Sequence, residues 1–129
     1  MRSSLDQCCI NVRDLARAER FYTEGLGMVV THRIEIPGVS EVVLQGSGGN
    51  RLQLAHHHGY DQPIQHGNGF WKLYLGTDDC SALHARAVAA GAEDVSAPQH
   101  LAQWNVRVAF VRDPDGYLLE IVESETDKG

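Results

Sequence analysis

The chain is poor in several features that mark particular classes of protein. Its 129 residues include 3 cysteines and 4 prolines, and aromatic residues make up 7%. No apolar run approaches the roughly 20 residues of a membrane span, and the first residues lack the apolar core of a signal peptide. A small, odd number of cysteines does not make a disulfide framework. We therefore expect a cytoplasmic protein with reduced thiols and no membrane partner.

Positive charge is also scarce. Lys and Arg number 11 against 17 Asp and Glu, giving a formal net charge of −6, and the basic residues form no stripe. Both facts argue against a nucleic-acid partner. With 43% hydrophobic content, the chain is long enough for a single domain with a real core. Because the net charge is negative, a small neutral or anionic ligand would have to be bound by charged groups close to its site.

The most informative stretch is VRVAFVRDPDGYLLEIVE, residues 106–123. Pro followed by Asp-Gly between two apolar, β-branched runs is typical of a tight turn, so the stretch predicts a hairpin. Alternation places Leu118, Glu120 and Val122 on one face of its second strand, and the other face is apolar too. Desolvating a lone carboxylate there is costly. Glu120 is therefore expected to pair with a cation, bind a metal or line a wetted cavity.

The first half of the chain predicts the order β-α-β-β-β. Residues 6–12 alternate as a strand, and Asp14 offers an N-cap for a helix of about three turns that Gly25 and Gly27 end. Cys8 faces the core in that strand. Three extended runs follow, at residues 28–36, 41–45 and 51–55.

The second half predicts the same order. A strand at residues 70–75 leads to a helix that begins after Asp79 and ends at Gly91, followed by a short extended segment at 93–96 and the hairpin. The resulting fold class is α+β. We expect one domain built of module 1 (about 5–56), a connection (57–68), module 2 (69–123) and a short C-terminal tail.

Counting supports an internal repeat. The two helix starts, Asp14 and Asp79, are 65 residues apart, and the same interval relates Gln7 to Lys72. Gln53 lies 67 residues before Glu120. These four polar side chains, Gln7, Gln53, Lys72 and Glu120, would occupy equivalent places on inward faces, and we expect them to share one cup.

Three segments together carry a resemblance: NVRDLARAERFYTEGLGM, RLQLA and FVRDPDGYLLEIVE. They resemble the vicinal oxygen chelate superfamily, which includes glyoxalase I, bleomycin-resistance proteins and extradiol dioxygenases. The resemblance runs from about residue 6 to about residue 123. It implies two βαβββ modules that form an open, cupped mixed sheet with helices outside, and a homodimer. The modules would combine within one chain or by exchange between two chains.

Metal-binding members of that superfamily place four side chains in the cup, and the matching positions here hold Gln7, Gln53, Lys72 and Glu120. A divalent Zn, Ni, Mn or Fe ion needs lone pairs, whereas a Lys ammonium is only a donor. Glu120 would favour the charged form of Lys72. We therefore expect an ion pair in place of the metal and no cofactor. The alternative is a retained metal with Lys72 swung aside.

Two function classes stay open. In the first, the protein binds a small organic molecule in an apolar cup. In the second, it is a lyase or isomerase of the glyoxalase type, with Glu120 as general base and Lys72 as electrophile, with or without a divalent metal. The candidate ligand contacts are Gln7, Cys9, Gln53, Phe70, Lys72, Tyr74, Leu118, Glu120 and Val122.

Glu120 and Lys72 also have simpler interpretations that involve no ligand. In these, Glu120 is a strand carboxylate in contact with water, and Lys72 extends to solvent with its stem packed on Phe70 and Tyr74.

Other residues of interest also have structural interpretations. Gln7 and Gln53 would hydrogen-bond each other. Cys9 has no neighbouring His to activate it as a nucleophile. The run His56 to His58 would be solvated, because adjacent residues diverge too far to hold one ion together. Trp71 is expected to pack in the core.

Overall fold

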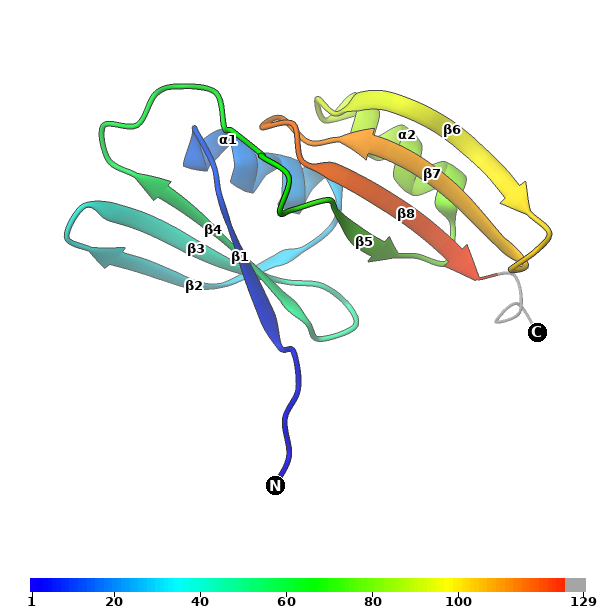
Figure 1. The fold of residues 1–129 in the computed structure, drawn as a ribbon, viewed down its shortest axis with the longest axis horizontal. Helices are drawn as coiled ribbons and strands as arrows, with labels where there is room; N and C mark the ends of the chain where they lie inside the picture. The colour runs from blue at the N-terminus through cyan, green and yellow to red at the C-terminus, as the bar shows by residue number, and fades with distance from the viewer. Residues whose placement is uncertain (125–129) are drawn as a thin grey trace. The chain divides into compact units, whose positions relative to one another are not determined.

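The computed structural model describes residues 1–124, which divide into two compact units, Met1–Ile64 (unit 1) and the part beginning at Gln65 (unit 2). Each unit has the order β-α-β-β-β, as Figure 1 shows. Unit 1 contains β1 (Gln7–Asn11), α1 (Leu15–Arg20), the π-helical turn η1 (Phe21–Gly25), β2 (Val29–Ile36), β3 (Val39–Gln45) and β4 (Arg51–His57). Unit 2 contains β5 (Lys72–Gly76), α2 (Cys80–Ala89), β6 (Glu93–Leu101), β7 (Val106–Arg112) and β8 (Leu118–Ser124).

Each unit builds an open, mixed sheet. The strand orders are β1-β4-β3-β2 and β5-β8-β7-β6. The first and last strands of each unit pair in parallel, and the remaining neighbours pair antiparallel. The predicted α+β fold of two βαβββ modules is therefore confirmed. In the described part of the chain, no helix combines the length and apolar character needed to cross a membrane.

The first helix begins where the sequence predicted. Asp14 has extended backbone angles, and its side chain accepts a hydrogen bond from the backbone N–H of Arg17. The helical path continues through η1, in which Phe21, Tyr22 and Gly25 are buried. The predicted three turns are thus found, with π-helical geometry in the last part.

The core of unit 1 lies between α1 and the sheet, because α1 packs on β3 and β4. Its buried side chains include Ile10, Val12, Ala18, Phe21, Tyr22, Val42, Leu44, Leu52 and Leu54. Since side chains alternate along a strand, Gln7, Cys9 and Gln53 lie on the sheet face away from this core. Cys8, expected to fill the core, is only half-buried.

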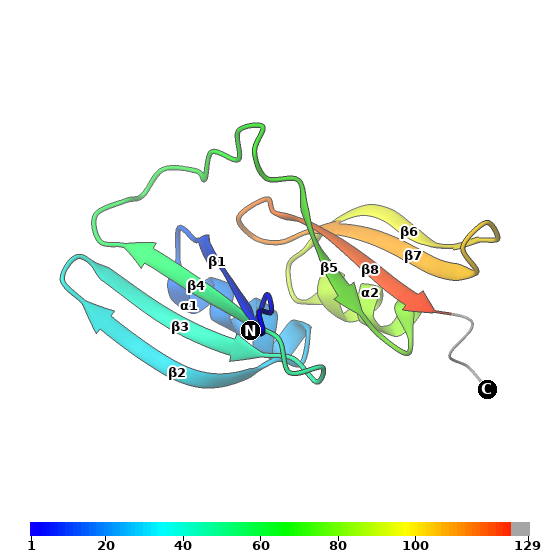
Figure 2. The same cartoon turned by 60° about the horizontal axis from the view of Figure 1, so that its bottom comes forward.

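In unit 2 the helix α2 is held to β8 by a carboxylate that the sequence patterns did not indicate. Glu123 is 2% exposed, and its Oε1 accepts a hydrogen bond of 2.6 Å from the backbone N–H of Cys80. Leu119, Ile121 and Glu123 are therefore on the α2 side of β8. Leu118, Glu120 and Val122 are on the other side, where they are half-buried. Figure 2 shows β8 between β5 and β7.

Several strand boundaries differ from the expected ones, and two strands are extended at their C-terminal ends. The strand β4 continues through His57, because its antiparallel pairing with β3 extends to Val39. The strand β6 runs on to Leu101 and includes Pro98, which an edge strand with register shifts tolerates. The expected C-terminal tail lies, apart from Ser124, outside the described residues.

The predicted hairpin joins β7 to β8, and one side chain organises its turn. Asp113 is 4% exposed, and its Oδ1 accepts hydrogen bonds of 2.9 Å from the backbone N–H groups of Asp115 and Tyr117. Gly116 has φ of 91°, which a side chain would strain. The turn therefore depends on a carboxylate acceptor and a glycine.

Replacing Asp113 with alanine should remove both hydrogen bonds and lower the free energy of unfolding by about 1–3 kcal/mol, because buried N–H groups lose their acceptor. Urea unfolding would measure the change. Asp113→Asn keeps an acceptor oxygen and should lose less. Equal stability of Asp113→Ala and the parent chain would contradict the role given to this side chain.

Candidate functional site

Unit 2 holds a charged pair on the sheet face away from α2. Lys72 Nζ, from β5, lies 2.5 Å from Glu120 Oε1, from β8. The two side chains are only 11% and 13% exposed. The parallel register pairs Tyr74 with Glu120, so Lys72 reaches its partner diagonally from two residues earlier in the strand.

Aromatic rings surround the Lys72 ammonium. Its Nζ lies 4.0 Å from the ring centroid of Trp71, 5.0 Å from that of Tyr74 and 5.6 Å from that of Phe110. Such positions over ring faces attract a cation. Phe110 was not among the predicted residues, although its position opposite Glu120 in the β7–β8 register would have indicated it.

The predicted burial of Trp71 is wrong. Its side chain is 74% exposed. The strand β5 begins one residue later, so Trp71 is not held in the alternation that would have turned it toward α2. Its ring lies instead against the ammonium of Lys72.

The pair keeps Lys72 protonated. Its hydrogen bond to the Glu120 carboxylate raises the pKa of Lys72 above the ordinary value of 10.5, and partial desolvation offsets only some of that effect. At neutral pH the amine therefore carries a proton and offers no lone pair. It can donate hydrogen bonds to an anionic or carbonyl group.

Unit 1 has an uncharged pair at the equivalent positions. Gln7 Nε2 donates a hydrogen bond of 2.8 Å to Gln53 Oε1, and Gln53 Nε2 donates in turn to Glu41 Oε2. Glu41, on β3, was not among the predicted site residues. The pattern that singled out Glu120, a carboxylate among apolar residues of a strand, would also have indicated Glu41.

Cys9 lies on the same face, beside Gln53 in the β1–β4 register. Burial raises the pKa of the Cys9 thiol, and the negative charge of Glu41 raises it further. The sulfur is therefore a protonated thiol at neutral pH, which is a poor nucleophile.

The other predicted residues fall in separate places. Phe70 packs edge-on against Tyr117, with ring centroids 5.5 Å apart. Leu118 and Val122 flank Glu120 on its face of β8, and Tyr74 is 65% exposed.

The three consecutive histidines each have a different partner. A ring nitrogen of His56 lies 3.2 Å from the backbone O of Val12, one of His57 lies 3.0 Å from Asn11 Oδ1, and one of His58 lies 2.8 Å from Ser40 Oγ. They do not converge on a common point.

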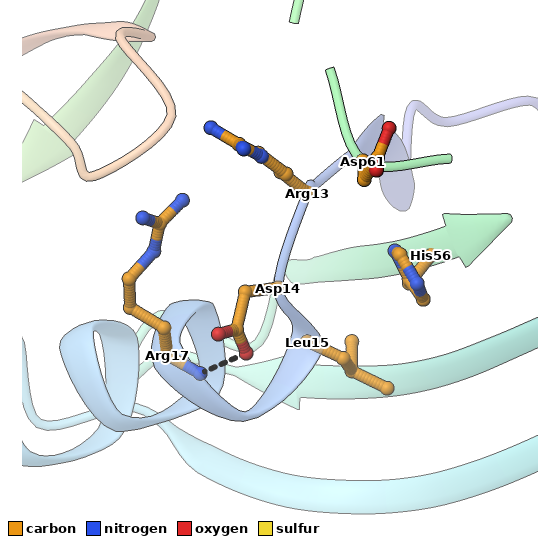
Figure 3. A pocket seen from close by; sticks show the side chains of 6 residues that line it. All are labelled: Arg13, Asp14, Leu15, Arg17, His56 and Asp61. Atoms are coloured by element: carbon orange, nitrogen blue, oxygen red, sulfur yellow. Dashed lines mark hydrogen bonds between the residues drawn. The ribbon is translucent and has the colours of Figure 1, made fainter. Parts of the chain in front are cut away.

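A pocket at the start of α1 was not predicted either. Figure 3 shows its lining side chains, which carry both signs of charge. They are Arg13, Asp14, Leu15, Arg17, His56 and Asp61. Since His56 alternates with the Gln53 face of β4, this pocket lies on the opposite side of the sheet from Gln53. Four of its lining residues come from the start of α1, and His56 and Asp61 join them from much later in the sequence.

The residues at the positions where the superfamily resemblance implies metal ligands do not fit a divalent ion. Lys72 is a protonated donor, and the amides of Gln7 and Gln53 are engaged with each other and with Glu41. Within residues 1–124, no three His, Cys, Asp or Glu side chains are grouped closely enough to hold an ion. Of the four positions, only Glu120 carries an anionic oxygen, and Lys72 already occupies it.

The fold and these motifs place the chain in a known family. It belongs to the Glyoxalase/Bleomycin resistance protein/Dioxygenase superfamily, whose model matches residues 4–121. Among curated relatives, a probable lactoylglutathione lyase of Synechocystis sp. is 30% identical over 124 residues, covering 92% of this chain and 94% of the relative. The lactoylglutathione lyase of Haemophilus influenzae is 27% identical, with 92% and 91% covered.

Solved structures agree on the fold. The trypanothione-dependent glyoxalase I of Leishmania major superimposes with a TM-score of 0.81 at 27% identity, covering 97% of this chain and 89% of that one. A glyoxalase/bleomycin resistance protein/dioxygenase domain from Frankia sp. gives 0.82 at 23% identity, with 96% and 99% covered. Maize glyoxalase I gives 0.83 at 24% identity, and the match covers 92% of this chain but only 43% of the maize chain.

The raised pKa of Lys72 predicts how stability depends on pH. The pair's contribution is fully present below the unfolded pKa, about 10.4, and is lost as pH rises through the higher folded value. Lys72→Met should therefore lower the urea midpoint at about pH 7 and lower it less at about pH 11, which is above the unfolded pKa.

Arg33→Met is the matched control. Arg33 pairs with Glu19 at 2.7 Å, and that hydrogen bond raises the already high pKa of the Arg33 guanidinium. Its effect on the urea midpoint should be the same at both pH values. A Lys72→Met effect that does not shrink at high pH would show that the charge of Lys72 contributes nothing.

Proposed function

We propose that this chain is a glyoxalase-like protein that binds a small organic molecule at an anchor formed by Lys72 and Glu120, without the superfamily's metal. The observation that carries this proposal is the ion pair of 2.5 Å whose ammonium lies among the rings of Trp71, Tyr74 and Phe110. By the superfamily resemblance, the pair stands at two of the positions where metal-binding members have ligands.

The surroundings of the pair suit a ligand with a planar or apolar part. Small-molecule sites are mostly apolar and aromatic, with a few polar groups that fix orientation. Trp71 and Tyr74 are both largely exposed beside the ammonium, so their rings are open to contact with a ligand. Lys72 would orient an anionic or carbonyl group over these rings. Phe70, Leu118 and Val122 are the further contacts we propose in unit 2.

Unit 1 offers polar groups of its own on the equivalent face of its sheet. Gln7, Cys9 and Gln53 lie on one side of the β1–β4 pair, away from α1. Their hydrogen-bonding groups suit a neutral polar part of a ligand. We also propose a homodimer, which the superfamily resemblance implies.

A retained metal is the less favoured arrangement. An ion bound by Glu120 would have to displace the Lys72 ammonium and break its charge-assisted hydrogen bond. The donor chemistry of this chain therefore supports metal-free binding.

A second candidate function is supported by the relatives that are named lactoylglutathione lyases. Here Glu120 would be the general base and Lys72 the electrophile at a developing negative charge, with or without a divalent metal. The Lys72–Glu120 contact supports this candidate, because a carboxylate that could act as base lies beside a cation. Turnover of a thioester would distinguish this candidate from simple binding.

Metal content tests the first part of the proposal. Untagged protein exchanged against Zn²⁺, Ni²⁺ or Mn²⁺ should retain well under one equivalent by elemental analysis, and Lys72→His should retain more because imidazole supplies a lone pair. Lys72→Met removes the charge without adding a ligand, so it is the control. Stoichiometric metal on Glu120 in the parent chain would refute metal-free binding.

Ligand binding tests the second part. A thermal-shift screen of small carboxylates, aromatic antibiotics and thioesters, including lactoylglutathione, would identify a ligand. Lys72→Met should weaken its binding roughly tenfold or more, because a charge-assisted contact is lost. The variant should also be less stable, since Glu120 loses its partner. Adding Glu120→Gln should restore stability without restoring binding.

The same variants separate binding from catalysis. For an enzyme, Glu120→Gln alone should abolish turnover of lactoylglutathione while leaving its affinity nearly unchanged, because a general base acts mainly in the transition state. If single and double variants match the parent in stability and binding, the pair is only a surface contact and the anchor is misassigned.

A further inference from the structure

The sheet face of unit 1 that points away from α1 carries an arginine at the start of β4. We propose that this residue, Arg51, is the anion-binding residue of the face and that it binds a carboxylate group of the ligand. The inference rests on the proposed function only in that this face contacts a small molecule. It adds the chemical class of a group that the ligand presents to unit 1.

The register of β4 with both of its neighbours fixes the position of Arg51. Arg51 is paired with Gln7 on β1 and with Gln45 on β3, so the three side chains lie on the same face. Both neighbours are neutral amides, and each donates one of its N–H groups to another residue of unit 1. The adjacent strands therefore supply no counter-charge directly beside the guanidinium.

The Arg51 guanidinium is incompletely satisfied. Arg51 is half-buried, and its Nε is a buried donor that meets no hydrogen-bond partner among residues 1–124. Arg33 shows the contrasting arrangement, because its two terminal nitrogens donate to the Glu19 carboxylate at 2.7 and 2.8 Å. A buried charged donor without an acceptor is costly. A bound anion would supply the acceptor that Arg51 lacks.

The charges of the whole face balance, but they lie apart. Of the strand residues that the register places on this face, Arg51 and Glu41 are the charged ones. Glu41 is paired with Ala55, four residues beyond Arg51 on β4, which is about 13 Å along a strand. Salt screens charges over about 8 Å at physiological ionic strength. Gln53 lies between the two and holds Glu41 with its amide, so the Arg51 end of the face stays positive.

The other titratable groups near Arg51 do not neutralise it. Asp6 is joined to it through the backbone, where its O accepts from the Arg51 N–H at 3.1 Å, but the Asp6 carboxylate accepts from Ser4 Oγ. Cys9, His32 and His57 share the face and add no negative charge at neutral pH, because the Cys9 thiol is protonated.

The groups at this end of the face suit a planar monoanion. A guanidinium presents its N–H groups as a fork that matches a carboxylate with two parallel hydrogen bonds. Gln7 has a second N–H group and a carbonyl oxygen that its contact with Gln53 does not use, so it can donate to the carboxylate or accept from a neighbouring hydroxyl. One cation balances one carboxylate, whereas a phosphate dianion would keep unpaired charge. An ammonium would be repelled by Arg51.

The binding experiment uses the full chain and follows the Nε–Hε NMR signal of Arg51, with that of Arg33 as the internal control. Propionate should shift the Arg51 signal and the NH₂ signals of Gln7 saturably. It should leave the Arg33 signal unmoved, because Glu19 already holds that guanidinium. Propionamide has the same shape without the charge, and neither it nor ethylammonium should give a saturable shift. Equal responses to propionate and propionamide, or tighter binding of methyl phosphate, would overturn the choice of a carboxylate.

Three variants assign the binding to Arg51. Arg51→Gln should weaken propionate binding at least tenfold, measured on the Gln7 signals, because a charge-assisted contact is lost. Arg51→Lys keeps the charge without the fork and should bind with intermediate affinity, a loss that is measurable even if Arg51→Gln does not fold. Arg33→Gln is the matched control on the α1 side of the sheet and should bind like the parent. Parent-like propionate binding by Arg51→Gln and Arg51→Lys would overturn the inference.

Size-exclusion chromatography separates a ligand site from a contact between two copies of the chain. The inference expects Arg51→Gln to keep the oligomeric state of the parent. If that variant changes the oligomeric state, and propionate leaves the Arg51 signal of the parent unmoved, a second copy covers the guanidinium and the inference is wrong.

This inference and the proposed function fail differently. Lys72→Met should leave the response of Arg51 to propionate unchanged, because Lys72 takes no part in that contact. If Lys72→Met abolishes binding of every ligand from the screen while the Arg51 signal ignores propionate, only the role of Arg51 is wrong. If propionate moves the Arg51 signal as expected and Lys72→Met leaves every ligand bound, the role of Arg51 holds and the Lys72–Glu120 anchor is wrong.

Discussion

The parallel pairing of the first and last strand in each unit is the constraint on which the rest depends. It sets β1 beside β4 and β5 beside β8 in the same register, so that Gln7 reaches Gln53 and Lys72 reaches Glu120 by the same diagonal step. A parallel pair needs a long crossover, and each unit meets that need with a helix. The helix covers one face of its sheet. The polar side chains are left on the other face, where a ligand can meet them.

The two units share the same strand geometry but carry different side chains at the equivalent positions. The same two positions hold two amides in unit 1 and an ammonium with a carboxylate in unit 2. An amide pair has both donors and acceptors to offer, whereas the ion pair satisfies itself and is further enclosed by aromatic rings. Within the glyoxalase superfamily, this chain thus carries an amide pair and an ion pair on one repeated strand framework.

Features fixed by neighbours in the sequence could be predicted well. The N-caps Asp14 and Asp79 and the turn at Asp113 to Gly116 depend on local backbone geometry, and all three form where the pattern indicated. Glu120 was found because strand alternation shows which face a residue occupies. The order of strands and helix along each half of the chain also followed from local patterns.

Features fixed by distant contacts could not be predicted in the same way. The exposure of Trp71 depends on where β5 begins, and that start is set by pairing with β8. Glu41 gains its role only when β3 lies beside β4 and Gln53 can reach it. Glu123 was overlooked because its partner is a backbone N–H of a helix 43 residues away. Sequence patterns carry little information about such partners.

Glu120 and Glu123 lie on opposite faces of the same strand and have different tasks. Glu123 joins β8 to the start of α2, and that attachment does not involve Lys72. The position of β8 is therefore secured from the helix side, whatever occupies residue 120. A mutation that exchanges the chemistry at the ligand face leaves this attachment intact. Side chains on the Glu120 face of β8 can therefore be exchanged without breaking the contact that holds β8 to α2.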